Sequence, residues 1–222
     1  MKKVKRILSL DWDYFIKATA LQRCTMFPDG GNENIGYSLQ DCIWNSCYTG
    51  CPKLKDIGIL QDDYSTTHYM LLNFVRNCMC NSVGNDPQFK MLVTVSHKWI
   101  YDFVMQRTEE NEQFEVYNVD FHHDMYNLPR DELNCGNWVN RLFEKRPNMK
   151  YFWVNREDSE DATPIGRKPP CKTKKLKDIE DLPFDYVFIC RSDCWSPPTS
   201  IVTLRDCGLS LNAVCLYQWS VG

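Results

Sequence analysis

Short runs of β-branched and aromatic residues recur along this chain, with helical patterns between some of them. The runs cover residues 4–11, 89–96, 114–120, 149–155 and 184–192. Apolar residues at helical spacing occur over residues 65–79, 97–107 and 136–146. Alternating strands and helices favour a mostly parallel sheet that is covered by helices on both faces. We therefore predict a three-layer α/β/α fold in which residues 1–222 form a single domain.

The composition fits one domain of this kind. Hydrophobic residues make up 43% and aromatic residues 13% of the chain, and the net charge of −3 gives no overall positive field to attract nucleic acid. The apolar stretch at residues 7–10 ends at Asp11, too early for a signal peptide, and no run approaches transmembrane length. We expect a cytoplasmic protein that binds neither nucleic acid nor membrane. The sequence leaves open whether it forms a homo-oligomer.

Two segments have the composition of long loops. Residues 16–60 are rich in Gly, Asn, Pro and Cys, and residues 156–181 contain few large apolar residues. Long loops in a compact domain often form lids or binding loops. The basic run at 167–177 could contact an acidic peptide, although a solvated loop is the simpler interpretation.

The chain contains 12 cysteines, some of them inside apolar or helical runs, such as Cys78, Cys190 and Cys215. Free buried thiols are the simplest interpretation of that placement. A zinc site could use the cysteines at 42, 47 and 51, but no two cysteines in the sequence have the Cys-x-x-Cys spacing. The cysteine pattern therefore gives little support for a structural metal.

Acidic and histidine residues follow four of the predicted strands at the point where each strand ends. Asp11 and Asp13 follow the first strand, His97 follows the second, and Asp193 follows the last. The strand at 114–120 runs into the stretch "DFHHD", which ends at Asp124. The carboxyl ends of parallel strands lie at one edge of a sheet, where α/β proteins build their sites. We therefore expect these side chains to meet.

Side chains alternate between two sides along an extended segment, and this alternation predicts which of these residues converge. It also predicts that His123 points away from them, where it either supports the ligands from behind or lies at the surface. The predicted metal ligands are Asp11, Asp13, His97, Asp120, His122 and Asp124. Four carboxylates placed together repel one another, and a divalent cation removes that repulsion. A set of carboxylates and imidazoles without cysteine suits Mn²⁺ or a similar metal, and bridging carboxylates would allow two ions. A water between two such ions would be acidified and would act as the nucleophile.

These motifs resemble those of the arginase/deacetylase superfamily. Its ureohydrolase members carry a His after a strand, a DxHxD segment at the next strand end and an SxDxD segment elsewhere. The matching stretches here are "VTVSHKW", "VDFHHD" and "SLDWD". The resemblance implies one Mn²⁺ held by His97, Asp120, Asp124 and Asp11, and a second held by Asp120, His122, Asp11 and Asp13. It also implies an arginase-like fold with a rearranged strand order, because the SxDxD segment comes first in this chain and late in arginases.

A finer resemblance concerns the substrate. DxHxD followed by a helix that starts with "NW", together with the late "RSDCWSPP", is similar to a small arginase-like family that includes peptide arginases. Those enzymes convert arginine side chains of ribosomally made precursor peptides to ornithine and release urea. The resemblance implies catalytic roles for Asp124 and His122. We also expect Asp193 to hold the guanidinium, Trp195 to form an apolar wall beside the arginine stem and Asn137 to contact the substrate.

Three other functions remain open at this point. Strand-then-DxD also resembles the first motif of haloacid-dehalogenase phosphatases, in which Asp11 would be the nucleophile and Asp13 the acid/base. A metal-dependent amide deacylase of the same superfamily would need fewer carboxylate ligands. The third alternative is a non-catalytic protein that binds metal for stability, or a peptide-binding module. Whether the substrate arginine is free or part of a peptide is not fixed by these motifs.

Overall fold

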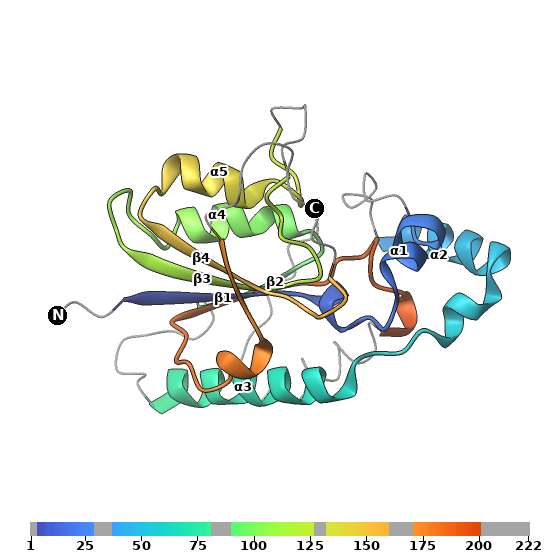
Figure 1. Ribbon diagram of the computed structural model, residues 1–222, viewed down its shortest axis with the longest axis horizontal. Coiled ribbons are helices and arrows are strands. Elements are labelled where there is room, and N and C mark those ends of the chain that lie inside the picture. The colour runs from blue at the N-terminus through green and yellow to red at the C-terminus, as the bar shows by residue number, and fades with distance from the viewer. Residues whose placement is uncertain (1–3, 29–36, 81–89, 127–131, 160–170, 201–222) are drawn as a thin grey trace.

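A parallel sheet forms the centre of the molecule in this computed structural model, which describes residues 4–28, 37–80, 90–126, 132–159 and 171–200 (Figure 1). Its strands are β1 Lys5–Asp11, β2 Met91–Thr94, β3 Phe114–Val119, β4 Met149–Val154, β5 Cys171–Lys174 and β6 Tyr186–Cys190. Their order across the sheet is β2-β6-β1-β3-β4-β5, and each neighbouring pair is parallel. The carboxyl ends of the strands therefore share one edge. The five strands predicted from sequence are confirmed.

Helices cover both faces of the sheet, which confirms the three-layer α/β/α arrangement. Helices α4 Ile100–Met105 and α5 Trp138–Lys145 lie on one face, and α3 Gln61–Cys80 lies on the other (Figure 1). Helices α1 Ala20–Met26 and α2 Tyr37–Gly50 lie beyond the carboxyl edge of the strands. The described residues also form the 3-10 helices η1 Trp12–Phe15, η3 Pro52–Asp56, η5 His97–Trp99 and η6 Leu176–Asp178.

Alternation along the central strand β1 divides its side chains between the two layers. Leu8 and Leu10 belong to the apolar cluster that includes α3, whereas Ile7 belongs to the cluster formed with α4 and α5. Because side chains alternate along a strand, Ser9 and Asp11 project to the same side as Ile7. The strand thus builds two cores and also carries polar groups to the carboxyl edge.

The segment 16–60, predicted to be a long loop, instead contains α1, α2 and η3. Helix α1 begins with a capping box, in which Thr19 and Gln22 satisfy each other's backbone N–H groups. Helix α2 buries Trp44 and Tyr48, which lie four residues apart and therefore on one helical face. The capping box and the spacing of the two aromatic residues indicate helices, but the prediction of a loop relied on the polar composition of the segment. Residues 29–36 of this segment lie outside the described residues.

The segment 156–181, also predicted to be a loop, contains the edge strand β5 and helix η6. Strand β5 pairs in parallel with β4 and has the sequence Cys-Lys-Thr-Lys. Lysines on an edge strand discourage pairing with another chain, but they also remove the apolar pattern that identifies a strand. The rest of the basic run, up to residue 170, lies outside the described residues.

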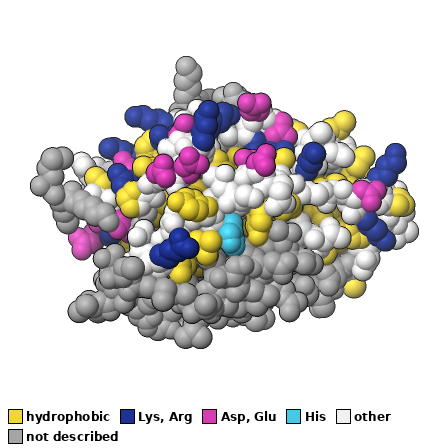
Figure 2. Space-filling view, turned by 90° about the horizontal axis from the view of Figure 1, so that it is seen from below, with side chains coloured by type: hydrophobic (Ala, Val, Ile, Leu, Met, Phe, Trp, Pro, Cys, Tyr) yellow, Lys and Arg dark blue, Asp and Glu magenta, His cyan; other side chains and the backbone are white. Residues whose placement is uncertain are grey.

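Two compositional expectations concern the surface and the cysteines. On the face seen in Figure 2, acidic and basic side chains are interspersed among the coloured residues rather than separated by sign. No helix within the described ranges is long and apolar enough to cross a membrane. Cys78 and Cys190 are buried, as expected, and Cys42, Cys47 and Cys51 are free cysteines. Cys215 lies outside the described residues.

Substitution of Trp44 tests whether the 16–60 segment is part of the packed structure. The Trp44 side chain is 1% exposed, and its Nε1–H donates to the backbone oxygen of Asp193 at 2.7 Å. We expect Trp44→Ala to lower the free energy of unfolding by about 3–5 kcal/mol in urea denaturation. The matched control Leu21→Ala, at a side chain 72% exposed, should change it by less than about 0.5 kcal/mol. Equal stabilities of the two variants would contradict the packing of α2.

Candidate metal centre

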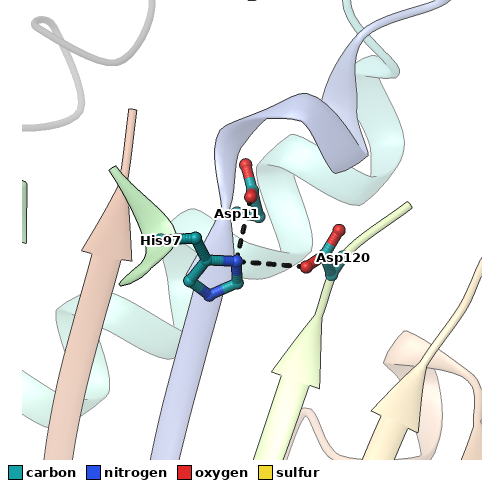
Figure 3. Close-up of side chains that lie close together, drawn as sticks. All are labelled: Asp11, His97 and Asp120. Carbon is teal, nitrogen blue, oxygen red and sulfur yellow. Dashed lines mark ion pairs between the residues drawn. The ribbon is translucent and has the colours of Figure 1, made fainter. Parts of the chain in front are cut away.

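Three side chains from three strand ends meet at the carboxyl edge of the sheet (Figure 3). Asp11 is the last residue of β1, Asp120 directly follows β3, and His97 begins η5 after β2. Strand β1 pairs with β3 on one side, and β6 separates it from β2 on the other. The sheet order therefore brings together residues that lie far apart in sequence, as predicted.

His97 is buried with its Nδ1 facing a group of carboxylates. Nδ1 lies 3.0 Å from Asp11 Oδ2, 3.2 Å from Asp120 Oδ2 and 3.0 Å from Asp124 Oδ2. On the opposite side of the ring, Nε2 lies 2.7 Å from Ser9 Oγ. A hydrogen bond at one ring nitrogen orients the other towards a metal in many histidine sites. Ser9 therefore holds the ring in an orientation suited to metal binding.

A second group forms around Asp13 and His122. His122 Nδ1 lies 3.1 Å from Asp13 Oδ2 and 3.8 Å from Asp120 Oδ1. The two oxygens of Asp120 are therefore divided, with Oδ2 near His97 and Oδ1 near His122. Asp120 consequently lies between the two histidines and is the residue that both groups share.

Either group can hold a metal ion. The first consists of Asp11, His97 and Asp120, and the second of Asp13, Asp120 and His122. Within each group, one ligand atom from every residue lies within 4.8 Å of the others. The resemblance implied that Asp11 bridges as well, but here Asp11 belongs only to the first group. Asp124 reaches the first group through its 3.0 Å contact with His97.

The backbone reaches this arrangement by a different route from the predicted strand alternation. Strand β3 ends at Val119, before the first ligand of the DxHxD segment. Asp124 has a φ of 53°, a left-handed conformation that is uncommon for residues other than glycine. Asp13 lies in the 3-10 helix η1 rather than in extended backbone. The predicted extended geometry was therefore wrong at these positions, although the predicted side chains do meet.

Burial and, after it, the charges of neighbouring carboxylates raise the pKa of two of the four carboxyl groups. Burial, reinforced by the charges of Asp13 and Asp120, raises the pKa of Asp11 from 3.8 to about 7. Burial, reinforced by the charges of Asp124 and Asp13, raises the pKa of Asp120 to about 7. Burial also acts to raise the pKa of Asp13, but the contacts with His122 and Arg23 lower it to about 2. Asp11 and Asp120 therefore need more positive charge than their neighbours supply.

The histidines supply part of that positive charge. Burial alone would lower the pKa of His97, but the charge of Asp11 and the contacts with the three facing carboxylates raise it well above 6.5. Burial likewise opposes protonation of His122, whereas Asp13 and other carboxylates raise its pKa to about 9. A divalent cation would replace these protons and neutralise the carboxylates more strongly. The donor set therefore fits a metal.

Further side chains hold the ligands in place. Trp138 Nε1 donates to Asp124 Oδ2 at 2.6 Å, and Asn118 Nδ2 donates to Asp120 Oδ2 at 3.0 Å. Buried Arg23 donates from Nη2 to the backbone oxygen of Asp13 at 2.8 Å, and its Nη1 lies 3.4 Å from Asp13 Oδ2. Such contacts restrict the rotamers of the ligands, and outer partners of this kind typically matter for metal affinity.

A cavity of about 230 Å³ opens beside the cluster. Its lining residues are Asp11, His122, Asp124, Tyr126, Cys135, Gly136, Ser192 and Trp195. The wall at Gly136 is close to Tyr126, because a Cβ at this position would come within 3.1 Å of the Tyr126 ring. The cavity gives a small molecule or an extended side chain access to both groups of ligands.

The three residues predicted to contact a substrate have different positions. Trp195 lines the cavity, and its ring centroid lies 5.3 Å from that of His122. The carboxylate of Asp193 is instead engaged at both oxygens by the Arg191 guanidinium, and it does not line the cavity. Asn137 is buried and organises the preceding turn through bonds to Asn134 N at 2.9 Å and Glu132 O at 3.0 Å. The substrate roles predicted for Asp193 and Asn137 therefore need correction.

His123 belongs to neither ligand group, in keeping with the prediction that it points away from the metal ligands. It is 2% exposed, so it lies in the interior rather than at the surface. Its Nδ1 accepts a hydrogen bond from the Met125 backbone N–H at 2.9 Å, and its ring centroid is 4.4 Å from that of Tyr126. His123 thus supports the turn that carries Asp124.

Sequence reasoning missed several supporting residues. Ser9 precedes Asp11 by two positions in an extended strand, so alternation could have placed both on one side. Arg23 lies in a segment that was interpreted as a loop, and the capping box of α1 was the signal for its helix. Nothing in the sequence connects Trp138 with Asp124, because that contact depends on how α5 packs.

Comparisons with known proteins do not add a family to this description. A scan against protein-family models and searches of curated proteins and of solved structures found no match to the chain. Function must therefore be inferred from the site itself.

The pKa shifts predict how the stability of the metal-free protein depends on pH. A pKa raised on folding means that the folded state binds the proton more tightly, so stability falls as pH rises through the shifted range. For Asp11 and Asp120 that range runs from 3.8 to about 7, and for His122 from 6.5 to about 9. The lowered pKa of Asp13 acts in the opposite sense only below 3.8.

We therefore expect chelator-treated protein to melt at a lower temperature at about pH 8.5 than at about pH 5. Added Mn²⁺ should raise the melting temperature more at the higher pH, where protons compete less for the ligands. Differential scanning fluorimetry at both pH values, with and without Mn²⁺, measures both effects. A metal-free protein that gains stability with rising pH would contradict the electrostatic account.

The adjacent histidines provide a matched pair of variants. We expect His122→Ala to lower the number of Mn²⁺ ions bound per chain, because it removes a ligand of the second group. His123→Ala should keep the metal content of wild type while lowering thermal stability, because His123 is buried outside both groups. Elemental analysis after chelation and reloading measures the metal. Equal losses of metal in the two variants would show that His122 has no special role.

Proposed function

We propose that this protein is a manganese-dependent hydrolase that converts arginine side chains of a peptide to ornithine and releases urea. The observation that carries the proposal is the pair of Asp/His groups sharing Asp120, placed beside a cavity at the carboxyl edge of a parallel sheet. In the same proposal, the chain is a relative of the arginase/deacetylase superfamily with a rearranged strand order. The small arginase-like family with peptide arginases is its nearest counterpart there.

The donor atoms support two Mn²⁺ ions as the cofactor. Both groups contain only carboxylate oxygens and imidazole nitrogens. These donors suit Mn²⁺, whereas structural zinc sites typically use thiolates. Asp120 offers one oxygen to each side, as a bridging carboxylate does. Asp11, His97, Asp120 and Asp124 would hold one ion, and Asp13, Asp120 and His122 the other. Bound there, the ions would make a water more acidic and stabilise negative charge as it develops.

The chain's own residues would then position the reactants. Asp124 contacts His97 and also lines the cavity, so its carboxylate is placed to orient the attacking water. The bond from Trp138 fixes Asp124 in that position. The water oxygen would add to the guanidinium carbon, and the bond from that carbon to the side-chain nitrogen would break. Arginine guanidinium and water thus give ornithine ammonium and urea, with protons balanced.

The lining of the cavity supports an arginine side chain as the substrate. A guanidinium is planar, cationic and rich in N–H donors, and Asp11 and Asp124 contribute negative charge to the cavity. Trp195 offers an apolar surface for the methylene stem. Among the described residues of the lining, there is no lysine or arginine to pair with the α-carboxylate of a free amino acid. That composition favours an arginine within a peptide.

Three observations weigh against the other functions. A phosphatase of the haloacid-dehalogenase type would need Asp13 as acid/base near its substrate, but Asp13 is 0% exposed, does not line the cavity and contacts Arg23. A single-metal amide deacylase would not use the second group around Asp13 and His122. A purely structural metal would not need a cavity beside its ligands.

The direct test is hydrolysis of an arginine peptide by the manganese-loaded protein. We expect urea to appear and the peptide mass to fall by the mass of CN₂H₂ for each arginine converted, as measured by mass spectrometry. The matched control is the same peptide with lysine in place of arginine. An unchanged arginine peptide, with cleavage of an acetyl-lysine peptide or a phosphate ester instead, would replace this proposal by one of its alternatives.

Asp124→Asn separates catalysis from folding. The substitution keeps the side-chain shape and an oxygen for Trp138, but it removes the charge that orients the water. We expect urea release to fall by roughly a hundredfold or more, as for other positioned acid–base groups, with an unchanged circular dichroism spectrum. Activity within a few-fold of wild type would contradict the role of Asp124.

A further inference from the structure

The hydroxyl of Ser192 is a buried polar group in the wall of the cavity. Ser192 is 1% exposed, and its Oγ has no hydrogen-bond partner within the described part of the chain. Buried hydroxyls normally have a partner, because leaving one unsatisfied is costly. An unsatisfied hydroxyl at the edge of a ligand cavity is therefore a candidate for binding a ligand.

The backbone around Ser192 is strained and firmly anchored. Ser192 has a φ of 55°, one of two positive values among the described non-glycine residues, and the other is at Asp124, which also lines the cavity. Its own carbonyl accepts from Trp195 N at 2.9 Å, and Arg191 N donates to Thr94 O at 2.8 Å. Residues held in sparsely populated backbone conformations concentrate at functional sites. Here the strained conformation belongs to a residue that lines the cavity.

The contacts of Asp193 explain why the hydroxyl of Ser192, rather than the carboxylate of Asp193, is available to a ligand in the cavity. Asp193 is held by the Arg191 guanidinium through both oxygens, and its backbone oxygen accepts from Trp44. These bonds fix the segment after β6. Ser192 is the polar residue of this segment that lines the cavity. Ser192 also belongs to neither metal-ligand group. A ligand can therefore engage it without competing with the metal.

We propose that Ser192 Oγ accepts a hydrogen bond from the guanidinium of the substrate arginine and so contributes to substrate recognition. This inference rests on the proposed function. A guanidinium has only donors, and a hydroxyl oxygen has two lone pairs, so the pair is chemically complementary. Asp11 and Asp124 would supply charge from the metal side of the cavity, and Ser192 a directional contact in its wall. The role first predicted for Asp193 thus moves to the preceding residue.

Ser192→Ala tests the inference, with Ser196→Ala as the matched control. Ser196 is also buried, and its Oγ also lacks a partner within the described residues, but it does not line the cavity. The assay uses a short peptide with one central arginine and measures kcat and KM from urea release by the manganese-loaded protein. Bound manganese and melting temperature are measured for each variant. Ser192→Gly serves as a second variant, because glycine removes the hydroxyl and adopts positive φ without strain.

We expect Ser192→Ala and Ser192→Gly to raise KM by about tenfold or more, the loss typical of a hydrogen bond to a charged group. Their metal content should stay that of wild type, and Ser196→Ala should leave KM within about twofold. If wild type releases urea and both Ser192 variants keep its KM, the role of Ser192 is refuted while the proposed function stands. If wild type releases no urea from the peptide, the proposed function is refuted and the Ser192 assignment falls with it.

Discussion

Repulsion among buried carboxylates at one edge of the sheet is the constraint on which the rest of this site depends. The four groups are Asp11, Asp13, Asp120 and Asp124, each at most 5% exposed. Burying an ionised carboxylate costs several kcal/mol unless opposite charge and hydrogen bonds compensate. His97 and His122 compensate in part by binding protons more tightly. The pKa of Asp11 and Asp120 nevertheless rises to about 7, so the compensation is incomplete without a cation.

The fold confines this repulsion to one place and shapes a cavity beside it. Strand β1 lies between β3 and β6, so its end at Asp11 is next to Asp120 and one strand away from the β2 segment that leads to His97. Ser9, inside β1, orients His97, while Trp138 at the start of α5 holds Asp124. Rigid strands and a packed helix thus fix the ligands, and the cavity is lined from the segments that follow β3 and β6. A site supported by such elements is held more precisely than a site on loops alone.

Sequence could predict the strands and the six side chains that converge, because both depend on local patterns and on the shared edge of parallel strands. It could not predict how the chain bends after each strand: the DxHxD segment leaves β3 at Val119 and turns at Asp124 with positive φ. It also could not predict that the Arg191 guanidinium binds the carboxylate of Asp193, the residue that was expected to hold the substrate. The helices within 16–60 were missed because composition was given more weight than the capping box at Thr19.

The proposed function requires that these carboxylates and imidazoles form a metal centre. The most direct measurement is an anomalous difference map, calculated from crystals grown with Mn²⁺ and data collected at the manganese absorption edge. We expect two peaks on either side of Asp120, one near His97 and the other near His122. Anomalous density at cysteine sulfurs or surface carboxylates, with none between Asp120 and the two histidines, would contradict it.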